Sequence, residues 1–339
     1  MIKNVAIVGA GVSGLTCGVL FAERGYRTAI FAEETGERTT SAAAAALWFP
    51  YDAEPADAVI AWALETYKVL VDLSHDSQTG VSMVELRSFS RMGEIPIPEW
   101  AIPLGAKRLE VSVIPAGVEK CPADRPNDVP HGFTSSFVIT VPLMDTTIYL
   151  DDLTKRFVEA GGSINGSVRF EKLENVDPKF DLVINCAGIG AKMLVPDADL
   201  EPHRGQIAIV PKIDLSCAIV CDGPPLMYAI PRANDCIFGG TNEFSDNRDV
   251  DPGSTSRILG ECSRVLKIDN PKVLAERVGL RPFRKSGVRV EREKLRDGRT
   301  VIHNYGHGGS GFTLSWGCAE MTPPKACPQR SSNKAALQH

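Results

Sequence analysis

The stretch VAIVGAGVSGLTCGVLFAERGYRTAIFAE occupies residues 5–33. Its apolar start, residues 5–8, is bounded by glycine and is typical of a buried parallel strand. Residues 15–24 have helical spacing of apolar side chains, and Gly25 suits the end of that helix. Residues 28–31 form a second apolar run. The pattern predicts a β-α-β unit, and therefore an α/β fold with a parallel sheet.

The turn between the first strand and the helix carries a G-x-G-x-x-G motif. Gly9 permits a tight turn, Gly11 leaves room for a pyrophosphate against the backbone, and Gly14 allows close packing of helix and strand. The helix start offers free N–H groups and a positive dipole end to phosphates. We expect the whole turn to contact a dinucleotide: Gly9, Ala10, Gly11, Val12, Ser13 and Gly14.

An acidic residue, Glu33, stands at the end of the second strand. It can accept a hydrogen bond from a ribose 2′-hydroxyl and would repel a 2′-phosphate, which argues against NADP. A glycine motif alone is a weak indication, but strand, helix, second strand and acid together are the complete fingerprint. The alternative is a glycine-rich turn in another α/β protein, and this unit does not distinguish FAD from NAD.

Composition restricts the class of protein. The chain has 339 residues, 43% of them hydrophobic, and a net charge of −5. This length suggests about two domains. Because there is no basic excess, nucleic-acid binding is not expected. No apolar run approaches the roughly 18 residues of a membrane span.

Nine cysteines lie mostly in apolar surroundings, so we expect them to be reduced. Cys217 and Cys221 lack partners for a metal site, and no metal is predicted.

Further elements follow from local pattern. Small residues at 39–46 suit a backbone lying against a cofactor, although a plain alanine-rich helix start is an alternative. Residues 56–73 predict an amphipathic helix, and 85–145 predict antiparallel strands, including 135–141. The predicted order continues with a helix at 151–160, a buried strand at 181–185, a strand at 205–210, and a strand-glycine-helix pattern at 301–317.

Six short segments carry a family resemblance. The longest is VIHNYGHGGSG at 301–311, followed by WGCA at 316–319; the others are LWFPY at 47–51, RGQ at 204–206, YAIP at 228–231 and GLRP at 279–282. The segments follow one another along the chain in the same order as in the D-amino-acid oxidase family, which includes D-aspartate oxidase. The sequence resembles this family over roughly residues 2–320. The resemblance implies a two-domain flavoprotein that oxidises D-amino acids to imino acids with O2 and releases H2O2.

The resemblance also predicts how the chain is divided. We expect an α/β fold in which a Rossmann-like FAD-binding domain is interleaved with a mixed, mainly antiparallel β-sheet substrate domain. Residues 1–55, 145–195 and 275–320 are assigned to the FAD-binding domain, and residues 56–144 and 196–274 to the substrate-binding domain.

Several residues are predicted to bind the substrate. A guanidinium group can hold a carboxylate through two hydrogen bonds, and Arg281 lies in an apolar context where an unpaired charge is costly. A buried structural ion pair is the alternative. By resemblance, Arg281 and the hydroxyl of Tyr228 bind the substrate carboxylate, and the Gly309 carbonyl accepts from its amine. Tyr51 and Phe49 are expected to line the pocket.

Other residues are predicted to hold FAD. The N–H groups of Gly311, Phe312 and Thr313 should begin the last helix and stabilise negative charge on the reduced flavin. The remaining predicted contacts with the flavin, its phosphates or its adenine come from the resemblance and from chain order: Thr40, Ser41, Leu47, Val168, Gly188, Gly308 and Gly309.

The chemistry implied by the resemblance needs no catalytic side chain. Hydride passes from the substrate Cα to flavin N5, O2 reoxidises the flavin, and the imino acid hydrolyses to a 2-oxo acid and ammonia. A histidine base is therefore not required, and His307 is not assigned a chemical role.

One segment departs from the family pattern. Residues 221–227 are short, contain two prolines and lack the tyrosine of a lid, so we expect an open entrance at which lid motion does not limit turnover. Phe49 and Cys221 suggest an uncharged wall, which favours neutral, apolar or broad D-amino acids. D-Aspartate oxidase is an alternative, in which Arg232 and His307 would serve the second carboxylate.

The end of the chain departs as well. Pro323 and Pro324 interrupt the helical pattern, residues 321–339 are expected to be disordered, and the shortened helix is expected to weaken FAD retention. The last residues carry no peroxisomal signal and the first carry no signal peptide, so a cytoplasmic location is expected; a homodimer is possible.

Three alternative functions stay open: a glycine- or sarcosine-type oxidase, a flavoprotein dehydrogenase, and a catalytically silent FAD-binding protein.

Overall fold

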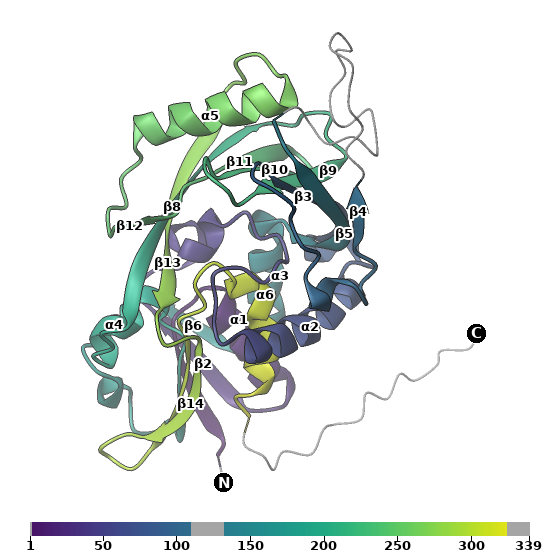
Figure 1. Ribbon diagram of the computed structural model, residues 1–339. Helices are drawn as coiled ribbons and strands as arrows, with labels where there is room; N and C mark the ends of the chain where they lie inside the picture. The colour runs from purple at the N-terminus through teal and green to yellow at the C-terminus, as the bar shows by residue number, and fades with distance from the viewer. Residues whose placement is uncertain (1, 110–131, 324–339) are drawn as a thin grey trace.

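Two β-sheets with helices packed on them make up the computed structural model, which describes residues 2–109 and 132–323 (Figure 1). The first sheet has six strands in the order β14-β15-β7-β1-β2-β6 and the second has nine. Residues 110–131 of the predicted antiparallel region, and the predicted disordered tail from residue 324 onward, lie outside the described residues.

The first sheet begins with the predicted β-α-β unit. Strand β1 (Asn4–Val8) pairs in parallel with β2 (Arg27–Ala32), and α1 (Val12–Glu23) connects them. Gly25 follows the helix at a φ of +85°, as a helix end of this type requires. Only β14 runs antiparallel in this sheet. The other strands are β6 (Ser163–Gly166), β7 (Leu182–Asn185), β14 (Arg289–Lys294) and β15 (Thr300–Tyr305).

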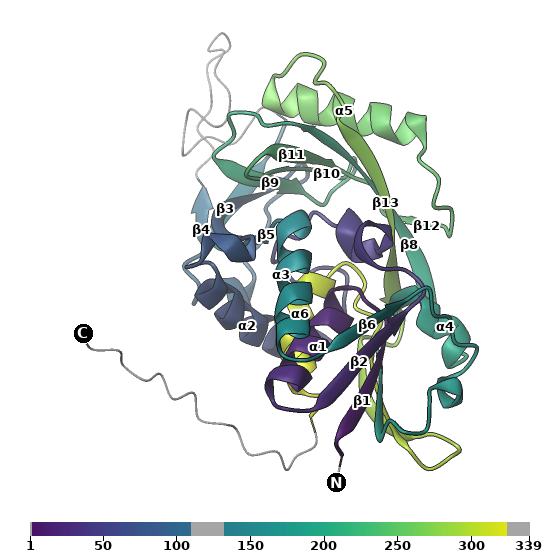
Figure 2. The same cartoon turned by 180° about the vertical axis from the view of Figure 1, so that it is seen from behind.

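Both faces of the first sheet are covered. On one face lie α1, α3 (Thr146–Glu159) and α6 (Gly311–Glu320), with α2 (Ala56–Leu73) packed against α6 (Figure 2). Their apolar side chains join those of β1 in a single core. On the other face Leu173, Val176 and Phe180 cover Ala6 and Val8. The near-continuous apolar character of β1 follows from this two-sided burial.

The helix predicted at 151–160 begins earlier than its apolar pattern indicates. The carboxylate of Asp145 accepts a hydrogen bond from the N–H of Thr147, and α3 therefore starts at Thr146. An aspartate at this position satisfies one of the free N–H groups of the first turn. The prediction missed this cap.

The second sheet is mixed and mainly antiparallel, as predicted; only β3 and β9 pair in parallel. Helix α5 (Pro252–Leu266) lies over β8, β10 and β11 at the end of the molecule away from the N-terminus (Figure 1). The strands are β3 (Val81–Ser90), β4 (Lys107–Leu109), β5 (Ser135–Met144), β8 (Leu200–Pro211), β9 (Cys217–Cys221), β10 (Met227–Pro231), β11 (Asp235–Gly239), β12 (Glu243–Phe244) and β13 (Ala275–Arg284).

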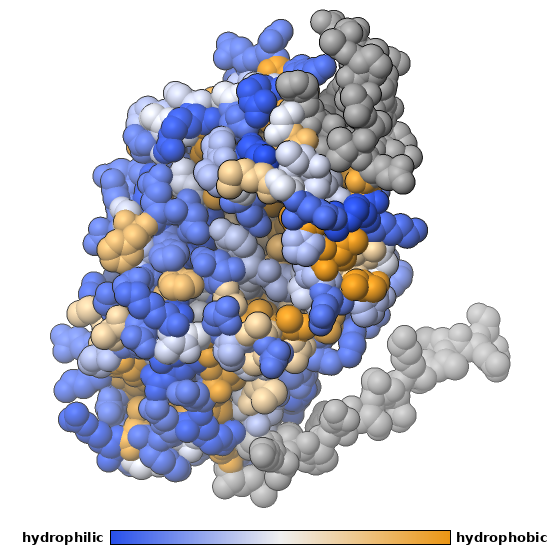
Figure 3. Space-filling view, in the orientation of Figure 1, coloured by the Kyte–Doolittle hydropathy of each residue, from blue (hydrophilic) through white to orange (hydrophobic). Residues whose placement is uncertain are grey.

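The visible surface is mainly hydrophilic, and its hydrophobic residues gather on the side of β4 and α2 (Figure 3). No helix in the described part of the chain is long and apolar enough to cross a membrane. Within residues 2–109 and 132–323, no group of three or more His, Cys, Asp or Glu could hold a metal ion. The seven cysteines that the structure describes are buried, and no disulfide joins any two of them; Cys121 and Cys327 lie outside the described residues.

Candidate active site

A cavity of about 740 Å³ opens between the two sheets. Volumes of 300–1,000 Å³ are usual for ligand and cofactor sites. Of the residues predicted to hold FAD or to bind the substrate, only Gly14 does not line it. Those that do are Gly9, Ala10, Gly11, Val12, Ser13, Glu33, Thr40, Ser41, Leu47, Phe49, Tyr51, Val168, Gly188, Tyr228, Arg281, Gly308, Gly309, Gly311, Phe312 and Thr313.

The glycine turn between β1 and α1 has no room for a side chain at its first or last glycine. A Cβ on Gly9 would stand 2.3 Å from the carbonyl oxygen of Cys186, and a Cβ on Gly14 would stand 2.0 Å from that of Gly9. Gly14 thus supports the turn from behind, which is why it is absent from the cavity wall. Gly11 is the N-cap residue of α1 and has no side chain that could cap the helix. The turn and the helix start therefore present backbone to the cavity.

The segment after β2 closes one side of this turn. Thr40–Ala43 forms a 3₁₀ turn, and the Ser41 hydroxyl accepts a hydrogen bond of 2.9 Å from the N–H of Val12. Glu33 and Val168 line the cavity farther along; the N–H of Val168 donates to the carbonyl of Ala32. Glu33 pairs with Arg169 at 3.3 Å, but both side chains are exposed. Such a surface pair is weak, so the Glu33 carboxylate can exchange it for a ligand hydroxyl.

Residues 47–51 are fixed against the start of α6. The Thr313 hydroxyl accepts from the N–H of Phe49 and donates to its carbonyl, at 3.1 and 3.0 Å. In the same manner the Ser310 hydroxyl bridges the N–H and the carbonyl of Tyr51. Because Ser310 is used in this way, it does not cap α6. The N–H groups of the first turn of α6 therefore face the cavity, which Gly311, Phe312 and Thr313 line.

Arg281 extends from β13 into the other end of the cavity. Its Nη1 donates to the carbonyl of Thr241 at 2.9 Å and contacts Asn242 Oδ1 at 3.4 Å. No carboxylate of residues 2–109 and 132–323 pairs with it within 4 Å, so the alternative of a structural ion pair finds no support among these residues. A cation that these residues hold only by carbonyl and amide oxygens favours an anionic ligand.

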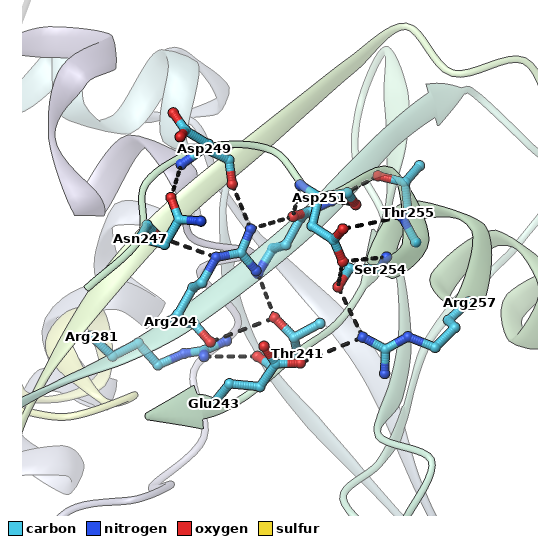
Figure 4. A network of polar contacts seen from close by, with 12 residues as sticks. Arg204, Thr241, Glu243, Asn247, Asp249, Asp251, Ser254, Thr255, Arg257 and Arg281 are labelled. Carbon is cyan, nitrogen blue, oxygen red and sulfur yellow. Dashed lines mark hydrogen bonds and ion pairs between the residues drawn. The ribbon is translucent and has the colours of Figure 1, made fainter. Parts of the chain in front are cut away.

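A buried polar network positions the carbonyl that Arg281 uses (Figure 4). The Thr241 hydroxyl accepts from the N–H of Gln206 at 2.9 Å. Arg204 donates to the Gln206 side chain at 2.6 Å and to the carbonyl of Asp249 at 2.7 Å. Arg204 and Gln206 are buried, so each needs these acceptors and donors. The RGQ motif thus holds residues 241–251 beside Arg281, a role that the sequence did not indicate.

Two tyrosines lie next to Arg281. The ring of Tyr228 covers the backbone of Gly239, where a Cβ would stand 2.0 Å from the ring. Burial raises the pKa of Tyr228, while the Arg281 charge lowers it. Tyr51 accepts a hydrogen bond of 3.2 Å from Asn242, which also contacts Arg281. Its pKa is raised, mainly by burial. Both hydroxyls are therefore neutral donors at physiological pH.

His307 lines the cavity but is held as a neutral ring. Burial lowers its pKa to about 4, and its Nε2 lies 3.0 Å from Asn304 Oδ1. An amide oxygen only accepts, so Nε2 carries the proton. A histidine of this kind is a weak base at neutral pH.

The predicted wall residue Cys221 faces away from the cavity. It is buried in the core beneath α5, and its neighbour Asp222 lines the cavity instead. Side chains alternate along a strand, so Val220 and the residue after the strand face the same side. The expected uncharged wall is therefore wrong at this position.

The short connection after Cys221 is tied down from outside. Arg91 donates to the carbonyls of Gly223 and Pro225 at 2.9 and 2.6 Å, and it pairs with Glu261 of α5 at 2.6 Å. One guanidinium group thus joins this connection to α5. No sequence pattern indicates this contact, because residues 91 and 261 are far apart in the chain.

Comparison with known proteins decides the family. A family model described as FAD dependent oxidoreductase matches residues 4–322, almost the entire chain. This chain belongs to that family. A D-amino-acid oxidase of Rubrobacter xylanophilus is 38% identical to this FAD-dependent oxidoreductase, with 94% of each chain covered. A D-aspartate oxidase of Homo sapiens is 31% identical, over 93% of this chain and 92% of the human protein.

Solved structures agree on the fold of this oxidoreductase. Glycine oxidase from Geobacillus kaustophilus superposes with a TM-score of 0.76 at 17% identity, covering 94% of this chain and 93% of that protein. L-Proline dehydrogenase from P. horikoshii gives a TM-score of 0.70 at 12% identity, covering 94% and 91%. At such identities the likeness concerns the fold alone.

The cavity of this oxidoreductase fits its cofactor, FAD. The N-termini of α1 and α6 both lie at the cavity. The backbone N–H groups of α1 suit the phosphate oxygens of FAD, and those of α6 suit the edge of the flavin ring that gains negative charge on reduction. Gly9 and Gly14 stand where a Cβ would be in contact with backbone, and Glu33 offers an acceptor for a ribose hydroxyl.

Proposed function

We propose that this oxidoreductase converts D-amino acids to 2-oxo acids and ammonia, with reduction of O2 to H2O2. One observation carries the proposal: Arg281 enters the cavity without a carboxylate partner among the described residues, beside the Tyr228 ring. A substrate carboxylate would supply the missing counter-ion through two charge-assisted hydrogen bonds. The named relatives, which include D-amino-acid oxidases and a D-aspartate oxidase, support the same substrate class.

In this proposal the side chains bind and orient the substrate. Arg281 and the neutral Tyr228 hydroxyl hold its carboxylate, and the carbonyl of Gly309 accepts from its amine. When bound, FAD supplies the two-electron acceptor and the reaction with O2. The buried, neutral His307 is not assigned a proton-transfer role, since its pKa of about 4 leaves it weakly basic at pH 7.

The cofactor contacts are part of the same proposal. Residues 9–13 and Ser41 would hold the phosphates, Glu33 and Val168 the adenosine part, and the start of α6 the flavin edge. Thr40, Leu47, Gly188 and Gly308 would complete the wall. We propose that the two domains are divided as the sequence suggests except at β13 (Ala275–Arg284). The prediction assigned this strand to the FAD-binding domain, but it pairs with β8 of the second sheet along its length.

D-Aspartate is not the expected preferred substrate. Arg232, the first candidate for a second carboxylate, is buried and already bound by both carboxylate oxygens of Asp235, at 2.6 and 2.7 Å. It does not line the cavity. The neutral His307 offers no positive charge at pH 7. These observations support neutral or broad D-amino acids as substrates.

The decisive experiment is a panel of D- and L-amino acids with H2O2 as readout. We expect oxidation of D-methionine and D-alanine, with much lower activity on their L-enantiomers and a smaller kcat/KM for D-aspartate. Arg281→Lys keeps the charge but loses the planar two-donor geometry, and should raise KM by about tenfold or more. Unchanged activity in Arg281→Ala would contradict the proposal. Anaerobic reduction by substrate followed by admission of air separates an oxidase from a dehydrogenase.

Two further predictions stay open. A homodimer is tested by light scattering of the purified holoprotein, and a cytoplasmic location by cell fractionation.

A further inference from the structure

Asp222 introduces an acidic group at the substrate end of the cavity. It directly follows β9 and lines the cavity together with Tyr51 and Tyr228. Burial is the main cause of the raised pKa of both tyrosine hydroxyls; the Asp222 charge raises each pKa further, while the Arg281 charge lowers it. Asp222 and Arg281 therefore act on the same pair of hydroxyls, and the Asp222 carboxylate lies within electrostatic reach of the proposed substrate position.

The Asp222 carboxylate has no partner in the part of the chain that the structure describes. Among residues 2–109 and 132–323 no hydrogen bond or ion pair is made by its side chain. Arg91, the nearby cation, directs its guanidinium to Cys221, to the loop carbonyls and to Glu261 instead. The residue has a large accessible surface, yet desolvation raises the pKa of its carboxyl group. Both observations fit a carboxylate whose open side is the cavity.

Much of the cavity wall on the side of Asp222 is apolar. Leu86, Val220, Leu226 and Ile230 line the cavity along with Asp222. An unbranched hydrocarbon chain gains free energy by leaving water for such a wall. A ligand with a carboxylate at one end, a stem of methylenes and a cation at the other end would match all three features.

We propose that Asp222 selects D-amino acids whose side chains end in a cation, the class of D-lysine and D-arginine. The proposal rests on the proposed oxidation of D-amino acids and names a substrate class within it. Asp222 binds the distal ammonium or guanidinium group while Arg281 binds the α-carboxylate. The same charge repels a second carboxylate, and so works against D-glutamate and D-aspartate.

The test compares two substrates that differ in one charged group. D-Lysine and D-norleucine share a four-carbon side chain, and only D-lysine adds an ammonium group. In Asp222→Asn the ratio of their kcat/KM values should fall about tenfold, since a partly exposed ion pair contributes little more than that, with D-norleucine nearly unchanged. Asp222→Lys should invert the preference towards D-glutamate. Asp214→Asn removes an exposed carboxylate outside the cavity and should leave the ratio unchanged.

A binding measurement needs no turnover of the tested ligand. 6-Aminohexanoate is lysine without its α-amino group, and hexanoate is the matching carboxylate without the terminal ammonium group. As inhibitors of D-norleucine oxidation, 6-aminohexanoate should bind more tightly than hexanoate to the wild-type protein and equally to Asp222→Asn. In the wild-type protein the D-lysine to D-norleucine ratio should also fall as salt is added, because ions screen the Asp222 charge. This last measurement does not depend on the folding of any variant.

The possible failures are distinguishable. If the wild-type protein oxidises D-norleucine but the D-lysine ratio and the inhibitor ratio are the same in Asp222→Asn, the role of Asp222 is wrong and the proposed function stands. An equal loss on both substrates would place Asp222 at the α-amino group and would likewise overturn the proposal. If no D-amino acid is oxidised at all, the proposed function itself fails.

Discussion

The guanidinium group of Arg281 lies directly against Gly205: a Cβ atom on Gly205 would stand 2.5 Å from both Nη1 and Nη2. Gly205 pairs with Gly279 across β8 and β13, and Arg281 is two residues farther along, so its side chain lies on the same face and crosses over Gly205. The missing side chain in β8 is what gives the guanidinium its place in the cavity.

Gly205→Ala should therefore displace Arg281 while sparing the cofactor. We expect kcat/KM for a neutral D-amino acid to fall at least tenfold, because the carboxylate would lose its two-donor contact. The matched control is Gly260→Ala in α5, where an added Cβ meets nothing within 4 Å. The measurements are peroxide kinetics and the absorbance of bound FAD. Full activity in Gly205→Ala would show that Arg281 tolerates displacement.

Alanine substitutions at Gly11 and Gly14 of the β1–α1 turn should differ in their effect on stability. A Cβ on Gly14 meets backbone at 2.0 Å, whereas a Cβ on Gly11 meets only the Ser41 hydroxyl at 3.0 Å. Both variants should lose FAD affinity, by about tenfold or more, but only Gly14→Ala should also lower the melting temperature of the apoprotein. Fluorescence titration with FAD and thermal unfolding without it measure the two effects. Equal melting temperatures in the two apoproteins would contradict this account.

Stability should depend on pH through His307. Burial lowers its pKa from 6.5 to about 4, so between these values the unfolded chain binds more protons than the folded one. The free energy of unfolding must then decrease as pH falls from 6.5 to 4, by as much as about 3 kcal/mol from this group alone. Urea unfolding at several pH values measures the slope. His307→Asn should flatten it, whereas exposed His75→Gln should not change it.

The connection after β9 should stay rigid during turnover. Arg91 and Arg264 both pair with Glu261 at 2.6 Å, but of these two only Arg91 also donates to the carbonyls of residues 223 and 225. Arg91→Ala should speed proteolytic cleavage within residues 221–227 severalfold, and Arg264→Ala should not. Pre-steady-state kinetics of the wild-type protein should show no slow product release. A dominant release step would contradict the expectation that lid motion does not limit turnover.

Local sequence was sufficient for the elements whose causes are local. The glycine turn, the strands of 5–8 and 28–31 and the helix of 56–73 follow from period, caps and small residues, and the structure confirms them. The start of α3 was missed because the apolar pattern begins after the Asp145 cap. The FAD-dependent family was predictable from the segments at 47–51, 228–231, 279–282 and 301–311.

The rest of the site depends on contacts between distant parts of the chain. Alternation along β9 would have indicated that Val220 and Asp222 share a face and that Cys221 does not, but only once the last residue of the strand was known. No local pattern indicates that Thr241 receives Arg281, or that Gly239 underlies Tyr228. These positions arise from the order of strands in the second sheet, which periodicity does not reveal.

The cavity wall includes Gly9 at one end of the chain and Thr313 near the other. Chains emerge from the ribosome starting at the N-terminus, and their early parts fold first. When only β1, α1 and β2 of a nascent chain have emerged from the ribosome, the glycine turn is present. The start of α6 and the hydrogen bond between Thr313 and Phe49 are still missing. The complete cavity therefore forms only after Thr313 has been synthesised, and cofactor loading on the finished wall follows translation of the residues from β1 to the start of α6.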